Sequence, residues 1–182
     1  MTVKSRSPSW RSTLHILALA SCGVIVMLAA QARAQDMRVD RLEIVESGFY
    51  DSTNATTTGS TPSAGAVTGT VQELGAFKLL PEPPATSARV GVGFGARFRS
   101  FGERDGERAM LRAVWTIPAP GIVNPTNGNA YRQSVAEFST TIGTNHWRGY
   151  SFDESWEVVP GTWTLEIWQD DRKLLEKSFE IK

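Results

Sequence analysis

Beyond residue 40, apolar and polar side chains alternate with a period of two over most of the chain. In the clearest run, 89–100, one row is apolar and the other consists of glycine and arginine. A period of two is typical of β-strands, whose successive side chains point to opposite faces. Glycines at every second position, with no helical pattern after them, indicate a strand crossed by neighbouring side chains rather than a phosphate-binding loop. The apolar row is Val90, Val92, Phe94, Ala96 and Phe98.

Similar runs, separated by turn residues, predict seven or eight antiparallel strands. No segment keeps a helical period over twelve residues. This number of short strands in one domain predicts an all-β fold, a single two-sheet immunoglobulin-like β-sandwich. The usual cysteine pair is absent, so Trp and Phe must fill the middle. Lys177 interrupts the apolar row of the last strand and indicates a bulge or an edge. The predicted strands lie at 41–50, 71–80, 89–100, 109–117, 131–142, 147–152 and on both sides of the turn at 169–172.

One stretch breaks the pattern. Residues 51–70 are rich in Thr, Ser, Gly and Ala and have no apolar periodicity. We expect a flexible inserted loop there.

Residues 1–34 have the layout of a secretory signal peptide. A basic start precedes an apolar run at 14–30, and small residues precede a predicted cleavage site after Ala34. Two alternatives remain, a retained membrane anchor and a lipoprotein lipidated at Cys22. Cleavage after Ala34 accounts for the whole apolar run, so we predict an exported β-sandwich domain at 35–182, most simply periplasmic, without a stable membrane span. Secretion or lipid anchoring is the less favoured expectation.

Cleavage changes the composition of the remaining domain. It keeps fifteen basic and nineteen acidic residues, a net charge of −4, which argues against nucleic-acid binding. Cys22, the single cysteine, leaves with the leader, and His146 is the single histidine that remains. These counts exclude thiolate and multi-histidine metal sites and leave little for nucleophilic catalysis. We therefore predict no catalytic residue, no metal and no cofactor.

Aromatic side chains and turn-rich loops are the better candidates for function. Exposed Trp and Tyr anchor protein or sugar ligands because they offer a large contact area at low entropy cost. Trp168 falls on the row opposite the apolar one, and Trp147 and Tyr150 lie near a strand start; covering the glycine-rich strand is the alternative role for such aromatics. The acidic group at 153–157 predicts a solvated loop, with a weak calcium site or acid catalysis as lesser alternatives. The candidate binding residues are Trp147, Tyr150, Trp168, Asn124, Asn127 and Tyr131.

Four segments in this order resemble a bacterial family of exported domains catalogued only as a domain of unknown function. The resemblance spans roughly residues 42–181 apart from the insertion. It implies an immunoglobulin-like fold and brings no activity and no catalytic residues. The segments are IVESGFY (44–50), GFGARF (93–98), IVNPTNG (122–128) and WEVVPGTWTLEI (156–167).

Together these features predict a non-enzymatic binding or interaction module of the cell envelope whose partner is an envelope protein. The alternative is a glycan- or peptidoglycan-binding module that uses exposed aromatic residues. A hydrolase is the least favoured hypothesis, because it would depend on His146.

Overall fold

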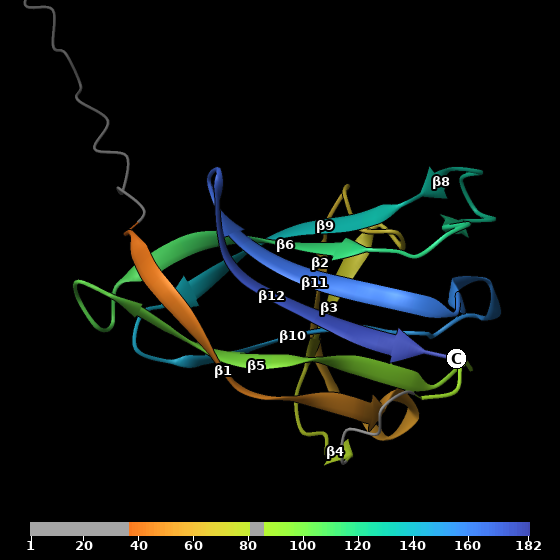
Figure 1. Ribbon diagram of the computed structural model, residues 1–182, viewed down its shortest axis with the longest axis horizontal. Helices are drawn as coiled ribbons and strands as arrows, with labels where there is room; N and C mark the ends of the chain where they lie inside the picture. Colours follow the sequence, from red (N-terminus) through yellow and green to blue (C-terminus); the bar gives the residue numbers. More distant parts are fainter. Residues whose placement is uncertain (1–36, 81–85) are drawn as a thin grey trace, which may run out of the picture. The chain divides into compact units, whose positions relative to one another are not determined.

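Two four-stranded antiparallel sheets face each other in the computed structural model, which describes residues 37–80 and 86–182 (Figure 1). The expectations for the leader, including its cleavage and the lipidation of Cys22, lie outside the described residues. Sheet 1 has the strand order β10-β5-β1-β4, and sheet 2 has the order β12-β11-β6-β9. Their strands are β1 (Val39–Asp51), β4 (Leu79–Leu80), β5 (Val92–Gly102), β10 (Asn145–Ser151), β6 (Arg108–Thr116), β9 (Gln133–Thr141), β11 (Gly161–Gln169) and β12 (Arg172–Ile181).

Besides the two sheets, the described residues form two short two-stranded ribbons and two 3₁₀ turns. The all-β class expected from the alternation is confirmed, and β12 is an edge strand, as Lys177 indicated. The ribbons pair β2 (Thr57–Pro62) with β3 (Thr70–Leu74) and β7 (Ile122–Val123) with β8 (Ala130–Tyr131), and the turns are η1 (Ser52–Asn54) and η2 (Ser155–Glu157).

Aromatic rings fill the space between the sheets. Phe94 of β5 is fully buried, and its ring centroid lies 5.4–5.5 Å from those of Trp115, Phe152, Trp163 and Phe179. All four pairs are edge-on or tilted, the arrangement that ring quadrupoles favour. These rings occupy the centre in the absence of a disulfide, as the sequence predicted.

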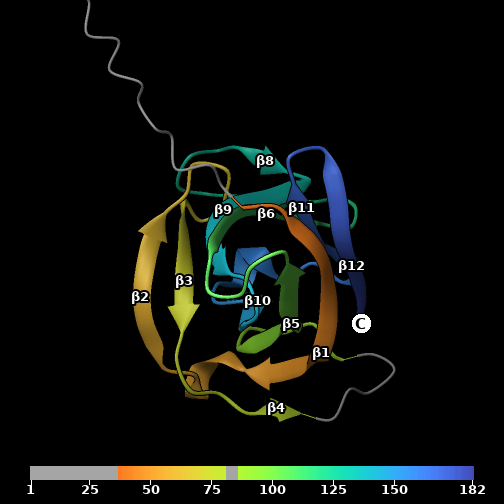
Figure 2. The ribbon, with the colours of Figure 1, turned by 90° about the vertical axis from the view of Figure 1, so that its left-hand side faces the viewer.

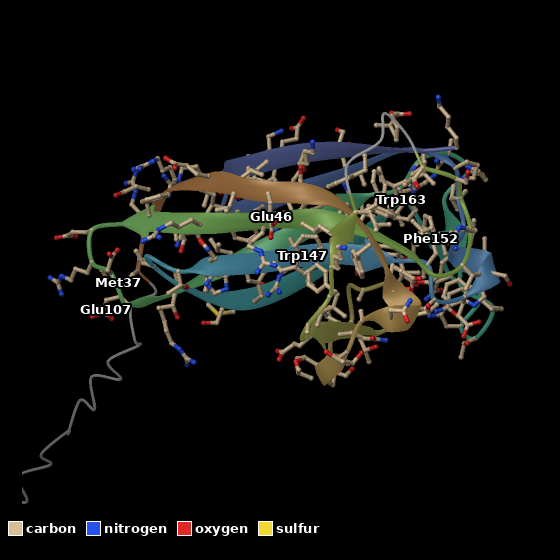
Figure 3. All side chains as sticks on the ribbon, turned by 90° about the horizontal axis from the view of Figure 1, so that it is seen from below. Met37, Glu46, Glu107, Trp147, Phe152 and Trp163 are labelled. Carbon is tan, nitrogen blue, oxygen red and sulfur yellow. The ribbon has the colours of Figure 1, made fainter. Side chains whose placement is uncertain are left out.

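The outer face of the same strand is covered by a second aromatic layer. Tyr50, Phe77 and Trp147 pack together over β5, with ring centroids 4.7–5.8 Å apart. A Cβ added at Gly93 would lie 2.2 Å from the Tyr50 ring, and one at Gly95 would lie 2.8 Å from the Trp147 ring. The glycines therefore let these rings lie against the backbone. Figure 3 views this face, where Trp147 is labelled near Glu46 of β1.

The insertion differs from the flexible loop that its composition predicted. It contains β2, which pairs with β3 at the start of the strand predicted at 71–80, and this β2–β3 ribbon leaves the end of β1 in sheet 1 and reaches β9 in sheet 2 (Figure 2). At its tip Val67 is buried, and the Gly65 carbonyl accepts a hydrogen bond from the Val135 amide at 2.8 Å. Nearly all residues of β2 are exposed, so this segment lacks the alternation that signals a strand. Threonine still favours strands, and the buried tip holds the ribbon in place.

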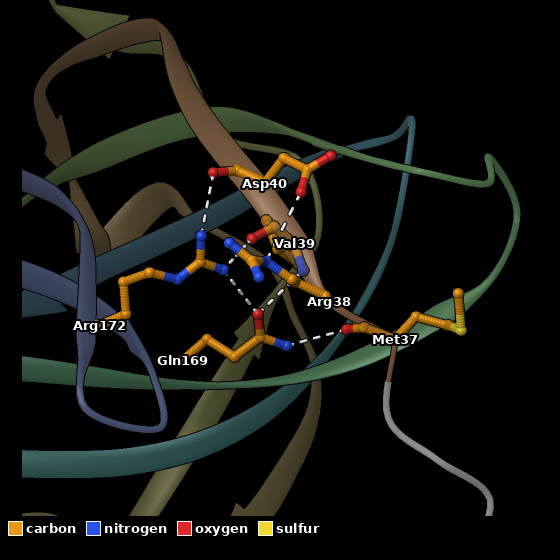
Figure 4. A network of polar contacts seen from close by, with 6 residues as sticks. All are labelled: Met37, Arg38, Val39, Asp40, Gln169 and Arg172. Atoms are coloured by element: carbon orange, nitrogen blue, oxygen red, sulfur yellow. Dashed lines mark hydrogen bonds and ion pairs between the residues drawn. The ribbon is translucent and has the colours of Figure 1, made fainter.

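A polar clamp joins the start of β1 to the β11–β12 turn (Figure 4). The Gln169 side chain is buried; its amide donates to the Met37 carbonyl at 2.9 Å and its oxygen accepts from the Val39 amide at 2.9 Å. The Arg172 guanidinium donates to the Val39 carbonyl and to the Gln169 oxygen. Buried backbone groups need such partners, because an unpaired one costs about 1–3 kcal/mol.

Substitution of Gly93 by alanine tests the outer aromatic layer. We expect Gly93→Ala to lower the free energy of unfolding by about 2 kcal/mol or more, because the new methyl group overlaps the Tyr50 ring. Gly59→Ala is the matched control, since its Cβ would meet only the flexible Glu73 side chain, at 3.3 Å. Urea unfolding measures both variants, and equal stabilities would contradict the packing described above.

Candidate functional site

The two predicted residues of β10 lie on opposite faces of sheet 1. Trp147 is half-buried on the outer face, between Tyr50 and Phe77. Tyr150 points between the sheets, with its ring centroid 4.7 Å from that of Trp163 and its hydroxyl donating to Glu157 at 2.9 Å. The two rings therefore share no surface on which a ligand could stack.

The three loop residues around β7 and β8 organise local structure. Asn124 is buried, and its side-chain amide donates to the Val67 carbonyl at the tip of the insertion, at 2.8 Å. Its side-chain oxygen accepts from the Thr126 amide at 2.8 Å. Asn127 is exposed and donates to the Tyr131 hydroxyl at 3.0 Å. Asn124 therefore docks the insertion, while Asn127 and Tyr131 hold their own loop.

Trp168 lies on the outer face of sheet 2 and is half-buried there. Its indole N–H donates to Glu166 Oε2 at 3.1 Å, and Glu166 Oε1 lies 3.0 Å from Lys173 Nζ. Lys173 also pairs with Glu176, and the hydrogen bonds to Glu176 and Glu166 raise the pKa of the lysine. A register shift between Ile167 and Trp168 places Lys173 directly opposite Trp168 on β12. This chain of contacts holds the indole ring in one orientation.

A shallow hollow of about 320 Å³ opens beside the Trp168 ring. Across the strands, Trp168 is paired with Arg112 of β6, and Arg112 is paired with Glu137 of β9. Arg112 also donates to the Asp170 carbonyl at 3.3 Å. The hollow thus combines an aromatic side chain with a positively charged hydrogen-bond donor and negatively charged acceptors. Its lining residues are Met110, Leu111, Arg112, Glu137, Trp168 and Asp170.

A second hollow, of about 450 Å³, lies on the other side of the Asp170–Asp171 turn. Its lining includes Gln169 and Arg172, which form the clamp on β1. Because these side chains already serve the fold, the Trp168 hollow is the better candidate site.

The acidic group at 153–157 is only partly the solvated loop that was expected. Asp153 and Glu154 are exposed, but Glu157 is 2 % exposed. Its carboxylate accepts the Tyr150 hydroxyl and the amides of Asp153 and Glu154, at 3.1 Å and 3.0 Å. Burial raises the pKa of Glu157, and the same hydrogen bonds oppose that rise. In residues 37–80 and 86–182, no group of three metal-ligating side chains is arranged to hold an ion.

His146 holds the β9–β10 turn. Its Nε2 atom accepts the Thr141 amide at 3.1 Å and lies 2.8 Å from the Thr144 hydroxyl. Burial lowers the pKa of this histidine, so the neutral ring, whose Nε2 atom accepts the Thr141 amide, is the favoured form.

The paired sheets and their aromatic core define an antiparallel β-sandwich protein. The chain belongs to the family described as Domain of unknown function (DUF3859), which matches residues 40–181. The resemblance noted from the sequence is thereby confirmed.

Among solved structures, the chain is similar to an immunoglobulin-like protein from Pseudomonas aeruginosa, with 24 % identity and a TM-score of 0.48. The similarity covers 81 % of this chain and 97 % of that one. No curated protein matches the chain. Within the described residues, no helix is long and apolar enough to cross a membrane.

The buried carboxylate gives a pH prediction. Since the folded-state pKa of Glu157 is raised, protonation stabilises the fold; this contribution is complete below the usual value near 4.5 and is lost as pH rises through the folded pKa. We expect Glu157→Gln to gain stability relative to the wild type between pH 4 and pH 7, measured by urea unfolding at each pH. Glu103→Gln, at an exposed turn, controls for the loss of one charge. If the stability difference between Glu157→Gln and the wild type did not vary with pH, the raised pKa of Glu157 would be contradicted.

Proposed function

We propose that this chain is a non-catalytic, exported binding module of the bacterial envelope, and that the Trp168 hollow is its binding surface. The orientation of the indole carries this proposal. A half-buried tryptophan held by Glu166 and Lys173 loses little conformational freedom when a ligand packs against it. Trp, Met and Arg are also the residue types enriched at binding surfaces, and Trp168, Met110 and Arg112 adjoin one hollow.

The loop at Asn124–Tyr131 is less suited to this role, because its amides are engaged in holding the insertion and the loop itself. The glycan platform expected from three aromatic residues also changes. Trp147 lies on the outer face of sheet 1, Tyr150 lies in the core, and Trp168 lies on the outer face of sheet 2. A glycan site could therefore use only one of these three rings, and Trp168 is the one that lines a hollow.

Export is supported by the pattern of residues 1–34, and it is testable by mass. We expect the protein isolated from a periplasmic fraction to begin at Gln35, as measured by intact mass spectrometry. A chain that begins at a lipid-modified Cys22, or that retains its apolar segment in the membrane fraction, would contradict cleavage after Ala34.

Photo-crosslinking in intact cells tests the binding surface. A diazirine amino acid at Met110 reacts with neighbouring protein or glycan alike, and we expect it to give a discrete adduct that disappears when Trp168 is changed to alanine. The same amino acid at exposed Arg99, on the outer face of sheet 1, is the matched control. Equal adducts from both positions, or an adduct indifferent to Trp168→Ala, would argue against this surface.

A further inference from the structure

We propose that the Trp168 hollow binds a neutral, hydroxyl-rich saccharide ring. This inference rests on the proposed function and adds the chemical class of the ligand. It is carried by the pairing of one oriented indole with donor and acceptor groups that face the same hollow.

The indole supplies the apolar part of the site. The C–H groups of a sugar ring form a nearly flat apolar patch, which packs well against an aromatic face. The bond from Trp168 Nε1 to Glu166, and the bond from Glu166 to Lys173, hold the ring before any ligand arrives. Met110 is 39 % exposed beside it and extends the apolar contact.

The rim supplies the polar part. In the segments that the structure describes, no ion pair engages the carboxylate of Glu137 or of Asp170, so both can accept hydrogen bonds from sugar hydroxyls. Arg112 lies opposite Glu137 in the cross-strand row and donates to the Asp170 carbonyl. Its guanidinium has five N–H donors, so it retains donors for hydroxyl oxygens.

Charge and size select among ligand classes. The lining carries one cation, Arg112, and two carboxylates, Glu137 and Asp170, and the Lys173 ammonium lies over the Trp168 ring, 5.8 Å from its centroid. A ligand of either charge would therefore meet a like charge. A neutral molecule with many hydroxyl groups can use both kinds of partner without bringing like charges together. The hollow, at about 320 Å³, also falls at the small end of small-molecule sites.

NMR titration of the exported protein, purified from cells, tests the inference. The probes are the trimer of N-acetylglucosamine, cellotriose and maltotriose. With at least one probe we expect the Trp168 indole N–H and the Met110 methyl signals to shift in a saturable way, while the signal of the buried Trp163 indole stays in place. Trp168→Ala should weaken the affinity about tenfold or more, as for an aromatic anchor.

Two further variants separate binding from folding. Glu137→Gln replaces one hydrogen-bond acceptor on an exposed surface and should weaken the same affinity without changing the melting temperature. Trp147→Phe, on the outer face of sheet 1, should leave the affinity unchanged.

The outcomes distinguish the inference from the proposed function. If no probe moves the Trp168 signal, or if Trp168→Ala binds as well as the wild type, the saccharide inference is overturned. A protein adduct from Met110 that depends on Trp168 would then still support a binding module, with a protein as its partner. If neither saccharide binding nor any Trp168-dependent adduct is found, the proposed function fails as well.

Discussion

Packing of aromatic rings on both faces of β5 is the constraint on which the rest of this structure depends. On the inner face, Phe94 meets rings from both sheets, so it joins them in the absence of a disulfide. On the outer face, Gly93 and Gly95 leave room for Tyr50 and Trp147 to lie against the backbone. Aromatic rings therefore cover both faces of β5. The strand lies between the outer rings of Tyr50 and Trp147 and the inner rings around Phe94. Sheet 1 therefore uses Tyr50 and Trp147 to cover β5, and sheet 2 has a half-buried tryptophan, Trp168, on its outer face.

Three buried polar side chains fix parts of the fold that the aromatic packing does not reach. Gln169 hydrogen-bonds the backbone at the start of β1, and Asn124 holds the tip of the insertion. Glu157 accepts three hydrogen bonds near the C-terminal end of β10. Each is buried and hydrogen-bonded, as expected for polar groups removed from water. The Trp168 surface differs because its carboxylates and guanidinium remain at the surface, where a ligand can replace water. That contrast separates the groups that hold the fold from those available for binding.

The fold was largely predictable from the sequence, whereas the candidate site was not. The period of two and the aromatic content gave the all-β sandwich, and Lys177 marked an edge strand. Strand β2 was missed because nearly all of its residues are exposed, so it has no apolar row to detect, whereas β3 falls within the strand predicted at 71–80. Trp168 was selected because it lies opposite the apolar row. Met110, Arg112 and Glu137 were missed because the pairing of β6 with β9 and β11 depends on register, and register brings together residues distant in sequence. Tyr150 and Asn124 were selected by residue type, which does not reveal burial.

The clamp at the start of β1 also determines how the domain responds to force. Met37 and Val39 are hydrogen-bonded to Gln169 of sheet 2, while Val39 pairs with Gly102 of sheet 1. Tension applied through the N-terminal end is therefore divided between the two sheets at the first residues of the strand. Beyond that point it meets the long β1–β5 ladder, which runs to Asp51 opposite Val92 and would have to shear rather than unzip. Pulling this end away from the domain would therefore require breaking the bonds to Gln169 and the β1–β5 ladder.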